Sequence, residues 1–278
     1  MKYADEIYGN TTIDGIFEEP IPVAGDMGDS HGALFAQQCW EPGMGKCTMG
    51  TGCSIMMNIG DKPRRSKSRL NTSLAWGMSG KVEYVFEGVI VFQGDTVKWL
   101  RDEMGFIENS AQSEEYANRV DSCDGVYFVP AFSGLGTPYW RVDVRAMIYG
   151  MNRSTNKYHI VRAGLESSTY QIRDIIEPMK REAGVELNEF RMDGGPANNA
   201  MLMQFTADIL NTKLLCNDVE ELSALGAAYA GGLAVGFFKD RSEIASLFKS
   251  STSYEPKMDR EKAEALYQGW KDAVKHLL

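Results

Sequence analysis

The sequence has few histidines, few cysteines and no long hydrophobic run. Its 278 residues include three histidines and five cysteines, and no two cysteines have the Cys-x-x-Cys spacing. This pattern indicates neither a disulfide framework nor a zinc site, so we expect reduced thiols and no metal site built from protein ligands. No apolar run approaches the roughly 20 residues of a membrane span, and the N-terminus lacks a signal-peptide pattern. A cytoplasmic protein without membrane contact is expected.

Positive charge is also scarce. The chain has 29 lysines and arginines against 38 aspartates and glutamates, which gives a formal net charge of −9. An acidic surface repels phosphate backbones, so a nucleic-acid partner is not expected. The one basic run, residues 63–69, is short and is interpreted as a solvated loop. Hydrophobic residues make up 44% of the chain and charged residues 24%, which is typical of a globular protein with a sizeable core.

Apolar periodicity, interrupted by glycine and proline, divides the chain into strands and helices. Early segments favour strands and later ones alternate between strands and helices, which predicts one mixed-sheet α/β domain over residues 1–278. The longest helix is expected at residues 156–182, with Asn156 as N-cap and a kink near Pro178. The other expected elements are strands at 21–25, 46–51, 54–59, 70–76, 84–86, 125–129, 189–192 and 213–216, and helices at 33–39, 91–104, 113–119, 199–210, 223–235 and about 258–277.

Three glycine-bearing turns follow or interrupt predicted strands, at residues 49–53, 132–136 and 193–199. Glycine lets a backbone approach a ligand and point N–H groups at phosphate oxygens. The third turn leads into a predicted helix, whose N-terminus favours an anion. None matches the Walker lysine loop or the Rossmann fingerprint, and a lone turn of this kind is usually only a turn. Two such turns, together with an isolated carboxylate at a strand end, favour a nucleotide site.

Asp29 is the candidate catalytic carboxylate. It lies within Gly28-Asp29-Ser30-His31, between a predicted strand and a predicted helix. There it could accept a proton from a substrate hydroxyl, or it could cap the helix. Because caps greatly outnumber catalytic bases among such aspartates, the residues alone favour the cap.

Several segments, in order and at similar spacing, resemble glycerol-kinase-like members of the FGGY family of carbohydrate kinases. The similarity runs from about Tyr8 to the C-terminus and is carried by Gly28-Asp29, 33–35, 50–53, 99–102, 125–140, 165–167, 193–195, 203–205 and 224–229. The resemblance implies an α/β actin/Hsp70/hexokinase-like (RNase H-like) domain with a mixed five-stranded sheet flanked by helices. It also implies that this chain is the C-terminal nucleotide-binding domain and that its partner, an N-terminal substrate domain, is absent. Alone, the chain would then be inert or nearly so, because half of the positioning groups would be missing.

The same resemblance implies the reaction and the residues that carry it. The expected chemistry is phosphoryl transfer from ATP, with Mg²⁺, to a hydroxyl of a small polyol or sugar, with Asp29 as general base. For Lys98, where the family more often has glutamine, a solvent-exposed helix lysine is the competing interpretation. Counting back from residues 203–205 favours Asn199 over Asn198. The residues implied to contact the phosphates are Gly50, Thr51 and Gly52, those implied to contact the nucleotide elsewhere are Gly94 and Lys98, and those implied to hold adenosine are Gly194, Gly195 and Asn199.

Two departures from the family pattern bear on the acceptor substrate. Ser30 stands where glycerol kinases have glutamine, and Ser54 stands where they have a phenylalanine that packs on the glycerol carbons. Smaller, polar side chains in a pocket wall leave room for a longer, more hydroxylated acceptor. We therefore expect Asp29, Ser30 and Ser54 to contact a tetritol or pentulose. The alternative is that the missing domain refills the space and the enzyme is glycerol kinase proper.

A third departure concerns regulation and assembly. Some bacterial glycerol kinases bind fructose bisphosphate through a basic, glycine-rich loop, but this chain has an acidic segment there, residues 14–20. Its carboxylates would repel a bisphosphate, so no such feedback is expected. The resemblance further implies a homo-oligomer for the full-length protein. Two other interpretations remain open: a non-catalytic nucleotide-binding fragment, and a structural domain whose glycines only form turns.

Overall fold

The computed structural model describes residues 2–217, 219–247 and 252–278, and its centre is a mixed sheet. The strand order is β11-β10-β9-β3-β4-β6-β5, so the sheet has seven strands rather than the expected five. Six of these strands had been predicted individually, and β11 escaped prediction because three half-polar residues give no clear alternation. The strands are β3 (Met44–Met49), β4 (Cys53–Gly60), β5 (Asn71–Met78), β6 (Lys81–Ile90), β9 (Glu189–Asp193), β10 (Leu214–Cys216) and β11 (Thr252–Tyr254).

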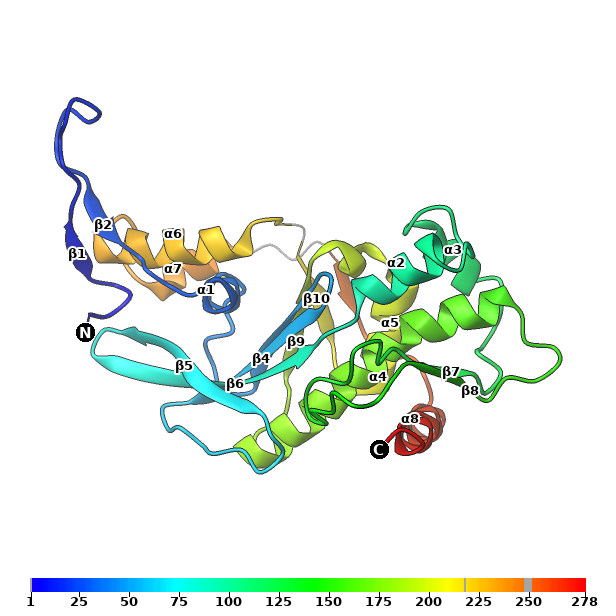
Figure 1. Cartoon of the computed structure of the whole chain (residues 1–278). Coiled ribbons are helices and arrows are strands. Elements are labelled where there is room, and N and C mark those ends of the chain that lie inside the picture. Colours follow the sequence, from blue (N-terminus) through cyan, green and yellow to red (C-terminus); the bar gives the residue numbers. More distant parts are fainter. Residues whose placement is uncertain (1, 218, 248–251) are drawn as a thin grey trace.

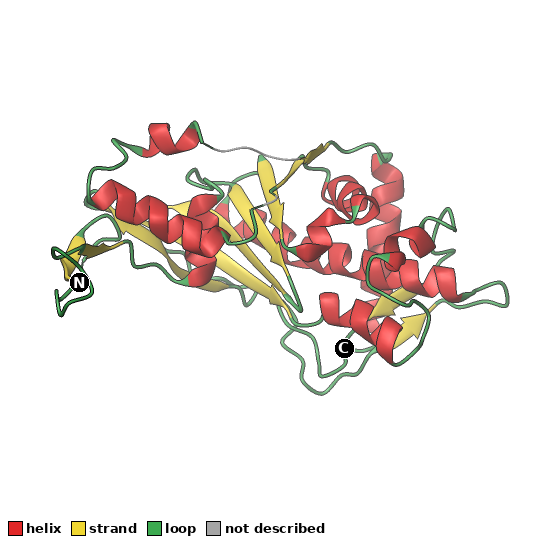
Figure 2. Cartoon of the chain, turned by 90° about the horizontal axis from the view of Figure 1, so that it is seen from above, coloured by secondary structure: helices red, strands yellow, loops and turns green. Residues whose placement is uncertain are grey.

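Helices cover both faces of the sheet (Figures 1 and 2). One face carries α1 (Asp29–Ala36), α6 (Leu222–Ala234) and α7 (Arg241–Ala245), and the other carries α4 (Lys157–Ala183) with α2 (Gly94–Asp102), α3 (Gln112–Ala117) and α5 (Ala200–Leu210) around it. The C-terminal helix α8 (Arg260–Lys275) packs beside the small sheet of β7 (Tyr127–Val129) and β8 (Met147–Tyr149). A short hairpin of β1 (Ile7–Asn10) and β2 (Pro22–Ala24) precedes α1.

Strand β4 shows how the sequence produces two cores. Ile55 and Met57 belong to the apolar cluster under α4, whereas Met56 belongs to the cluster under α1. Successive side chains of a strand point to opposite faces, so a strand buried on both sides reads as a continuous apolar run. Burying each such side chain contributes about 1.5–3 kcal/mol, which fixes this strand at the centre of the sheet.

Two predicted boundaries were wrong near glycines. The first helix was expected at residues 33–39, but α1 spans Asp29–Ala36 and so begins four residues earlier. The interior Gly32 hid this start because glycine is a poor helix former. The structure needs it, since a Cβ on Gly32 would lie 2.6 Å from the Ser223 carbonyl oxygen of α6. Strand β6 is likewise longer than the expected 84–86, and a Cβ on Gly88 would lie 2.5 Å from Ile175 of α4.

The long helix α4 agrees with the sequence. The Asn156 side chain accepts the Tyr158 N–H, and the His159 ring accepts the Asn156 N–H, which completes a capping box. The helix continues past Pro178 and ends at Gly184, whose φ of 66° is left-handed. Such an end favours glycine because other residues pay a steric cost there.

Asp174 of α4 fastens the C-terminal helix to the body. Its carboxylate is buried and accepts hydrogen bonds from Tyr267 Oη at 2.7 Å, Trp270 Nε1 at 2.8 Å and Tyr139 Oη at 2.9 Å. Burial is the largest influence on its pKa and raises it from 3.8 to about 6, although the three donors act in the opposite direction. The folded state therefore holds this proton more tightly than the unfolded chain does.

This shift predicts a pH dependence of stability. The stability gained because the folded chain binds the Asp174 proton more tightly is fully present below pH 3.8, and it is lost as the pH rises through about 6. Between pH 4 and 7 the free energy of unfolding should fall by about 2 kcal/mol more in the natural chain than in Asp174→Asn. Urea denaturation across that range measures the difference, with Glu177→Gln, at a half-exposed position on the same helix, as control. Parallel pH profiles for the natural chain and Asp174→Asn would contradict the prediction.

Candidate active site

Two of the glycine turns meet at one end of the sheet. Strands β3 and β9 are parallel neighbours in which Thr48 pairs with Asp193, so the turns that follow them emerge side by side. A Cβ on Gly194 would lie 2.0 Å from the Met49 carbonyl oxygen, and the φ of Gly194 is 89°. The two backbones therefore touch, and only glycine fits at the point of contact.

A pocket of about 480 Å³ opens beside these turns and contains most of the predicted nucleotide residues. They come from the β3–β4 turn, the start of α2 and the turn before α5, which are far apart in the sequence. The pocket is lined by the predicted residues Gly50, Thr51, Gly94, Lys98, Gly195 and Asn199, and also by Gln93, Val97, Ser110, Ala111, Ser113, Glu114, Leu165, Pro196, Asn198 and Leu202.

The lining glycines divide into two kinds. A Cβ added to Gly50 would lie 3.7 Å from its nearest neighbour, the Gly52 carbonyl oxygen, and a Cβ added to Gly195 would have no neighbour within 4 Å. Neither is demanded by internal packing, so each leaves open backbone for a ligand. Gly94 differs, because its N–H donates to the Gly50 carbonyl at 3.0 Å and its Cβ would lie 2.5 Å from that oxygen. Gly94 therefore joins the start of α2 to the β3–β4 turn.

Gly52 and Gly194 do not line this pocket. A Cβ on Gly52 would lie 2.4 Å from the Ile90 carbonyl oxygen, and Gly194 presses on Met49 as described above. These two glycines fix the backbone of the two turns, and the residues next to them, Thr51 and Gly195, line the pocket. The second glycine turn predicted from sequence, residues 132–136, also stays outside the pocket, and a Cβ on Gly136 would lie 2.6 Å from the Val89 carbonyl oxygen.

The N-terminus of α5 borders this pocket, and its Met201 N–H donates to Glu114 Oε1 at 3.0 Å. Asn199 is the N-cap, and its side-chain oxygen accepts the Leu202 N–H at 2.9 Å. The amide NH₂ of Asn199 remains for a ligand, beside the positive end of the helix dipole. Lys98 is exposed on α2 and lines the same space, which agrees with both interpretations of this lysine.

Several lining residues could not be found from sequence patterns. Gln93 is 3% exposed, and its side-chain oxygen has no hydrogen-bond partner among the described residues. Residues 110–114 close the pocket from the start of α3. Neither group has a recognisable motif, so only the fold brings them here. Within the described ranges, no cluster of His, Cys, Asp or Glu could hold a metal ion, and no helix has the length and apolar character to cross a bilayer.

Asp29 is the first residue of α1, and it does not cap the helix. The N-cap is Gly28, which makes no side-chain cap bond, and the Asp29 carboxylate instead accepts the N–H of the next residue, Ser30, at 2.6 Å. The capping interpretation, which the residues alone favoured, is therefore wrong. The carboxylate is exposed and open to a ligand.

The two predicted acceptor-site serines lie side by side. Ser30 Oγ and Ser54 Oγ are 3.2 Å apart, which brings the start of α1 to the start of β4. Behind them, Lys46 Nζ donates to Ser54 Oγ at 3.2 Å and to Thr48 Oγ1 at 2.9 Å. Burial lowers the pKa of Lys46. The sequence did not single out this lysine.

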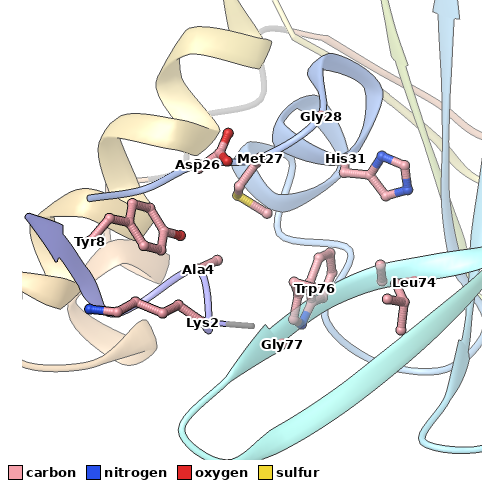
Figure 3. A pocket seen from close by; sticks show the side chains of 11 residues that line it. Lys2, Ala4, Tyr8, Asp26, Met27, Gly28, His31, Leu74, Trp76 and Gly77 are labelled. Carbon is pink, nitrogen blue, oxygen red and sulfur yellow. The ribbon is translucent and has the colours of Figure 1, made fainter. Parts of the chain in front are cut away.

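A second pocket, of about 510 Å³, lies on the other side of α1, between the N-terminal segment and β5 (Figure 3). Gly28 and His31 line it, but Asp29 does not. His31 Nε2 lies 3.3 Å from Glu87 Oε1, and the hydrogen bond from His31 is the main cause that lowers the pKa of Glu87. This pocket contains none of the predicted site residues.

Comparison with known proteins supports the family resemblance. A model of the C-terminal domain of the FGGY family of carbohydrate kinases matches residues 45–235. Over 99% of its length, the chain is 48% identical to glycerol kinase of Xanthomonas campestris pv. campestris and 47% identical to that of Bacillus subtilis. It covers 55% of each, so the chain spans about half the length of these curated relatives.

Solved structures agree. A crystal structure of Plasmodium falciparum glycerol kinase with ADP superposes with a TM-score of 0.94 at 34% identity, covering 100% of this chain and 56% of that one. A ligand-bound xylulose kinase from Lactobacillus acidophilus gives a TM-score of 0.87 at 17% identity, with 99% and 56% covered. These matches confirm the actin/hexokinase-like α/β class. The chain belongs to the FGGY family of carbohydrate kinases and corresponds to its C-terminal domain.

Proposed function

We propose that this chain is the nucleotide-binding half of an ATP-dependent carbohydrate kinase that phosphorylates a hydroxyl of a sugar or polyol. The observation that carries the proposal is the convergence of three distant segments on one pocket at a helix N-terminus. The family and the ADP named for the Plasmodium falciparum structure support a nucleotide as the ligand. The open space beside Gly50 and Gly195, together with the positive end of the α5 dipole, fits an anionic phosphate chain.

In this proposal the chain's residues bind and orient the two substrates. The Thr51 hydroxyl holds phosphate oxygens in the open space beside Gly50, whose own N–H donates to the Gly52 carbonyl oxygen at 2.8 Å. Gly195 and Asn199 hold the nucleoside end, while Gly52 and Gly194 fix the two turns. Lys98 can contact the nucleotide from α2. Mg²⁺ bound with ATP would neutralise charge on the transferring phosphoryl group.

Asp29 performs the proton transfer. Its carboxylate accepts the proton of the acceptor hydroxyl while that oxygen forms its bond to the γ-phosphorus, and the bond from phosphorus to the bridging oxygen breaks, which releases ADP. The exposed carboxylate at the start of α1 is accessible for this step. Phosphoryl transfer depends mainly on positioning and charge stabilisation.

The acceptor is proposed to be a four- or five-carbon polyol or ketose. Ser30 and Ser54 present two small hydroxyl groups beside Asp29, where a larger apolar side chain would fit a smaller acceptor. Glycerol is the second candidate, and it is favoured by the names of the most similar curated relatives. A non-catalytic nucleotide-binding fragment remains the alternative from another class.

Catalysis is proposed to need the part of the relatives that this chain does not cover. We assign residues 1–278 to one domain and the uncovered part to an N-terminal domain that supplies further contacts to both substrates. A cytoplasmic location and a homo-oligomeric full-length enzyme belong to the same proposal. The buried free thiols Cys39, Cys47, Cys53 and Cys123 support a reducing compartment.

An ADP-release assay tests the proposal. The chain is assayed alone and fused behind the N-terminal half of the Bacillus subtilis relative, with Mg·ATP and glycerol, erythritol, ribulose or xylulose. We expect turnover only from the fusion, at least 10²-fold above the chain alone, and fastest with a four- or five-carbon acceptor. The N-terminal half alone is the background control, and calorimetry measures ADP binding to the chain alone.

Each outcome has a distinct meaning. Fastest turnover with glycerol would keep the kinase and reject the larger acceptor. ADP binding without turnover on any acceptor would favour the non-catalytic fragment. Absence of both would leave a structural domain whose glycines only form turns.

A further inference from the structure

Lys46 is a buried cation between the two sides of the candidate site. It lies in the middle of β3 and is 0% exposed. A buried ammonium group is costly unless polar partners satisfy it. Its two hydrogen bonds, to Ser54 and Thr48, lead in opposite directions. One leads to the acceptor side and the other to the nucleotide side.

The acceptor branch runs through the two serines. The ammonium group of Lys46 can only donate, so Ser54 Oγ accepts from it and keeps its own proton to donate. Ser30 Oγ, 3.2 Å away, is in place to accept that proton. The Ser30 hydroxyl proton then faces the space beside Asp29, whose carboxylate is held by the Ser30 N–H. The last group of this branch, the Ser30 hydroxyl, is thus a hydrogen-bond donor next to the proposed base, Asp29.

The nucleotide branch runs through Thr48. Thr48 Oγ1 accepts from Lys46 and donates to Asp193 Oδ2 at 3.2 Å. Asp193 is 3% exposed, also accepts a hydrogen bond from Gln37 Nε2, and directly precedes the Gly194–Gly195 turn. Burial raises the pKa of Asp193, and the charge of Lys46 opposes that shift. The charges of Lys46 and Asp193 therefore stabilise one another, and the Thr48 hydroxyl bridges the two side chains.

We propose that Lys46 is a positioning residue shared by both substrates. It orients the Ser54 and Ser30 hydroxyls so that they donate to an acceptor oxygen, a keto or hydroxyl group, next to the reacting hydroxyl. Through Thr48 and Asp193 it also holds the turn that carries Gly195 to the nucleotide. The identity of the two ligands rests on the proposed function, whereas the hydrogen-bonded link is a property of the chain itself.

Single hydroxyl deletions separate the two branches. Ser54→Ala cuts the acceptor branch, Thr48→Val cuts the nucleotide branch at nearly constant shape, and Lys46→Met cuts both. In the fusion enzyme, Ser54→Ala should raise the acceptor KM about tenfold with the KM for ATP unchanged. Thr48→Val should raise the KM for ATP, and weaken ADP binding to the chain alone, by a similar factor without changing the acceptor KM. Lys46→Met should do both, and Lys46→Arg should restore part of each.

Amide hydrogen exchange of the unliganded chain tests the link without either substrate. Thr48→Val should accelerate exchange in residues 193–199 but not in residues 29–31, Ser54→Ala should do the reverse, and Lys46→Met should accelerate both. This pattern in the chain, together with no turnover by the fusion enzyme on any acceptor, would reject the kinase proposal and keep the hydrogen-bonded link through Lys46. Uniform acceleration in all three variants, or no separation of the two KM values in an active fusion, would overturn that role. The two hydroxyl deletions decide the matter if Lys46→Met does not fold.

Discussion

Asp29→Asn is expected to lower kcat of the fusion enzyme by about 10³-fold, within the range that general-base groups contribute. Asparagine keeps the size of the side chain and its oxygen can still accept the Ser30 N–H, which Asp29 accepts at 2.6 Å. It has no basic carboxylate, so the acceptor proton has no receiver. ADP affinity of the chain should stay within about twofold, since Asp29 does not line the nucleotide pocket.

Asp26→Asn is the matched control for this prediction. Asp26 is an exposed carboxylate in the loop directly before α1, and it lines the pocket on the other side of that helix. It should leave kcat unchanged. If Asp29→Asn retained more than about a tenth of the natural kcat, another group would have to accept the proton.

Gly194→Ala is expected to destabilise the fold by about 3 kcal/mol or more and to abolish ADP binding. Its φ of 89° is unfavourable for alanine, and the new Cβ would stand 2.0 Å from the Met49 carbonyl oxygen. The contacted atom is backbone, and Met49 is held by its pairing with Cys53 of β4. Relief therefore requires the turn to leave β3, and Gly195 would leave the pocket with it.

Gly195→Ala is the neighbouring control. It has nothing within 4 Å of its missing Cβ, so the free energy of unfolding should change by less than about 1 kcal/mol. A methyl group there would project where the pocket is open, so ADP affinity should still fall. Urea denaturation and calorimetry measure the two effects. Equal stability of Gly194→Ala and the natural chain would show that this turn can move without loss.

Several features were predictable from the sequence because they depend on neighbours along the chain. The spacing of apolar residues predicted the central parts of α4, α5 and β4. Asn156 predicted the start of α4, and the capping box confirms it. Glycines before or within short polar stretches marked the turns after β3 and β9. Element ends near Gly32 and Gly88 were misjudged, because those glycines serve contacts with α6 and α4 that lie far away in the sequence.

The family, the alternation of strands and helices, and the candidate site residues could all be read from the sequence without a structure. These follow from local patterning and from segment order, which a linear chain displays directly. The fold was needed to see that Gly195 faces open space whereas Gly194 faces the backbone of Met49. It also decided that Asp29 is free of capping and that Lys46 joins two branches. These properties depend on atoms brought within a few ångströms from distant segments, and no local pattern encodes such distances.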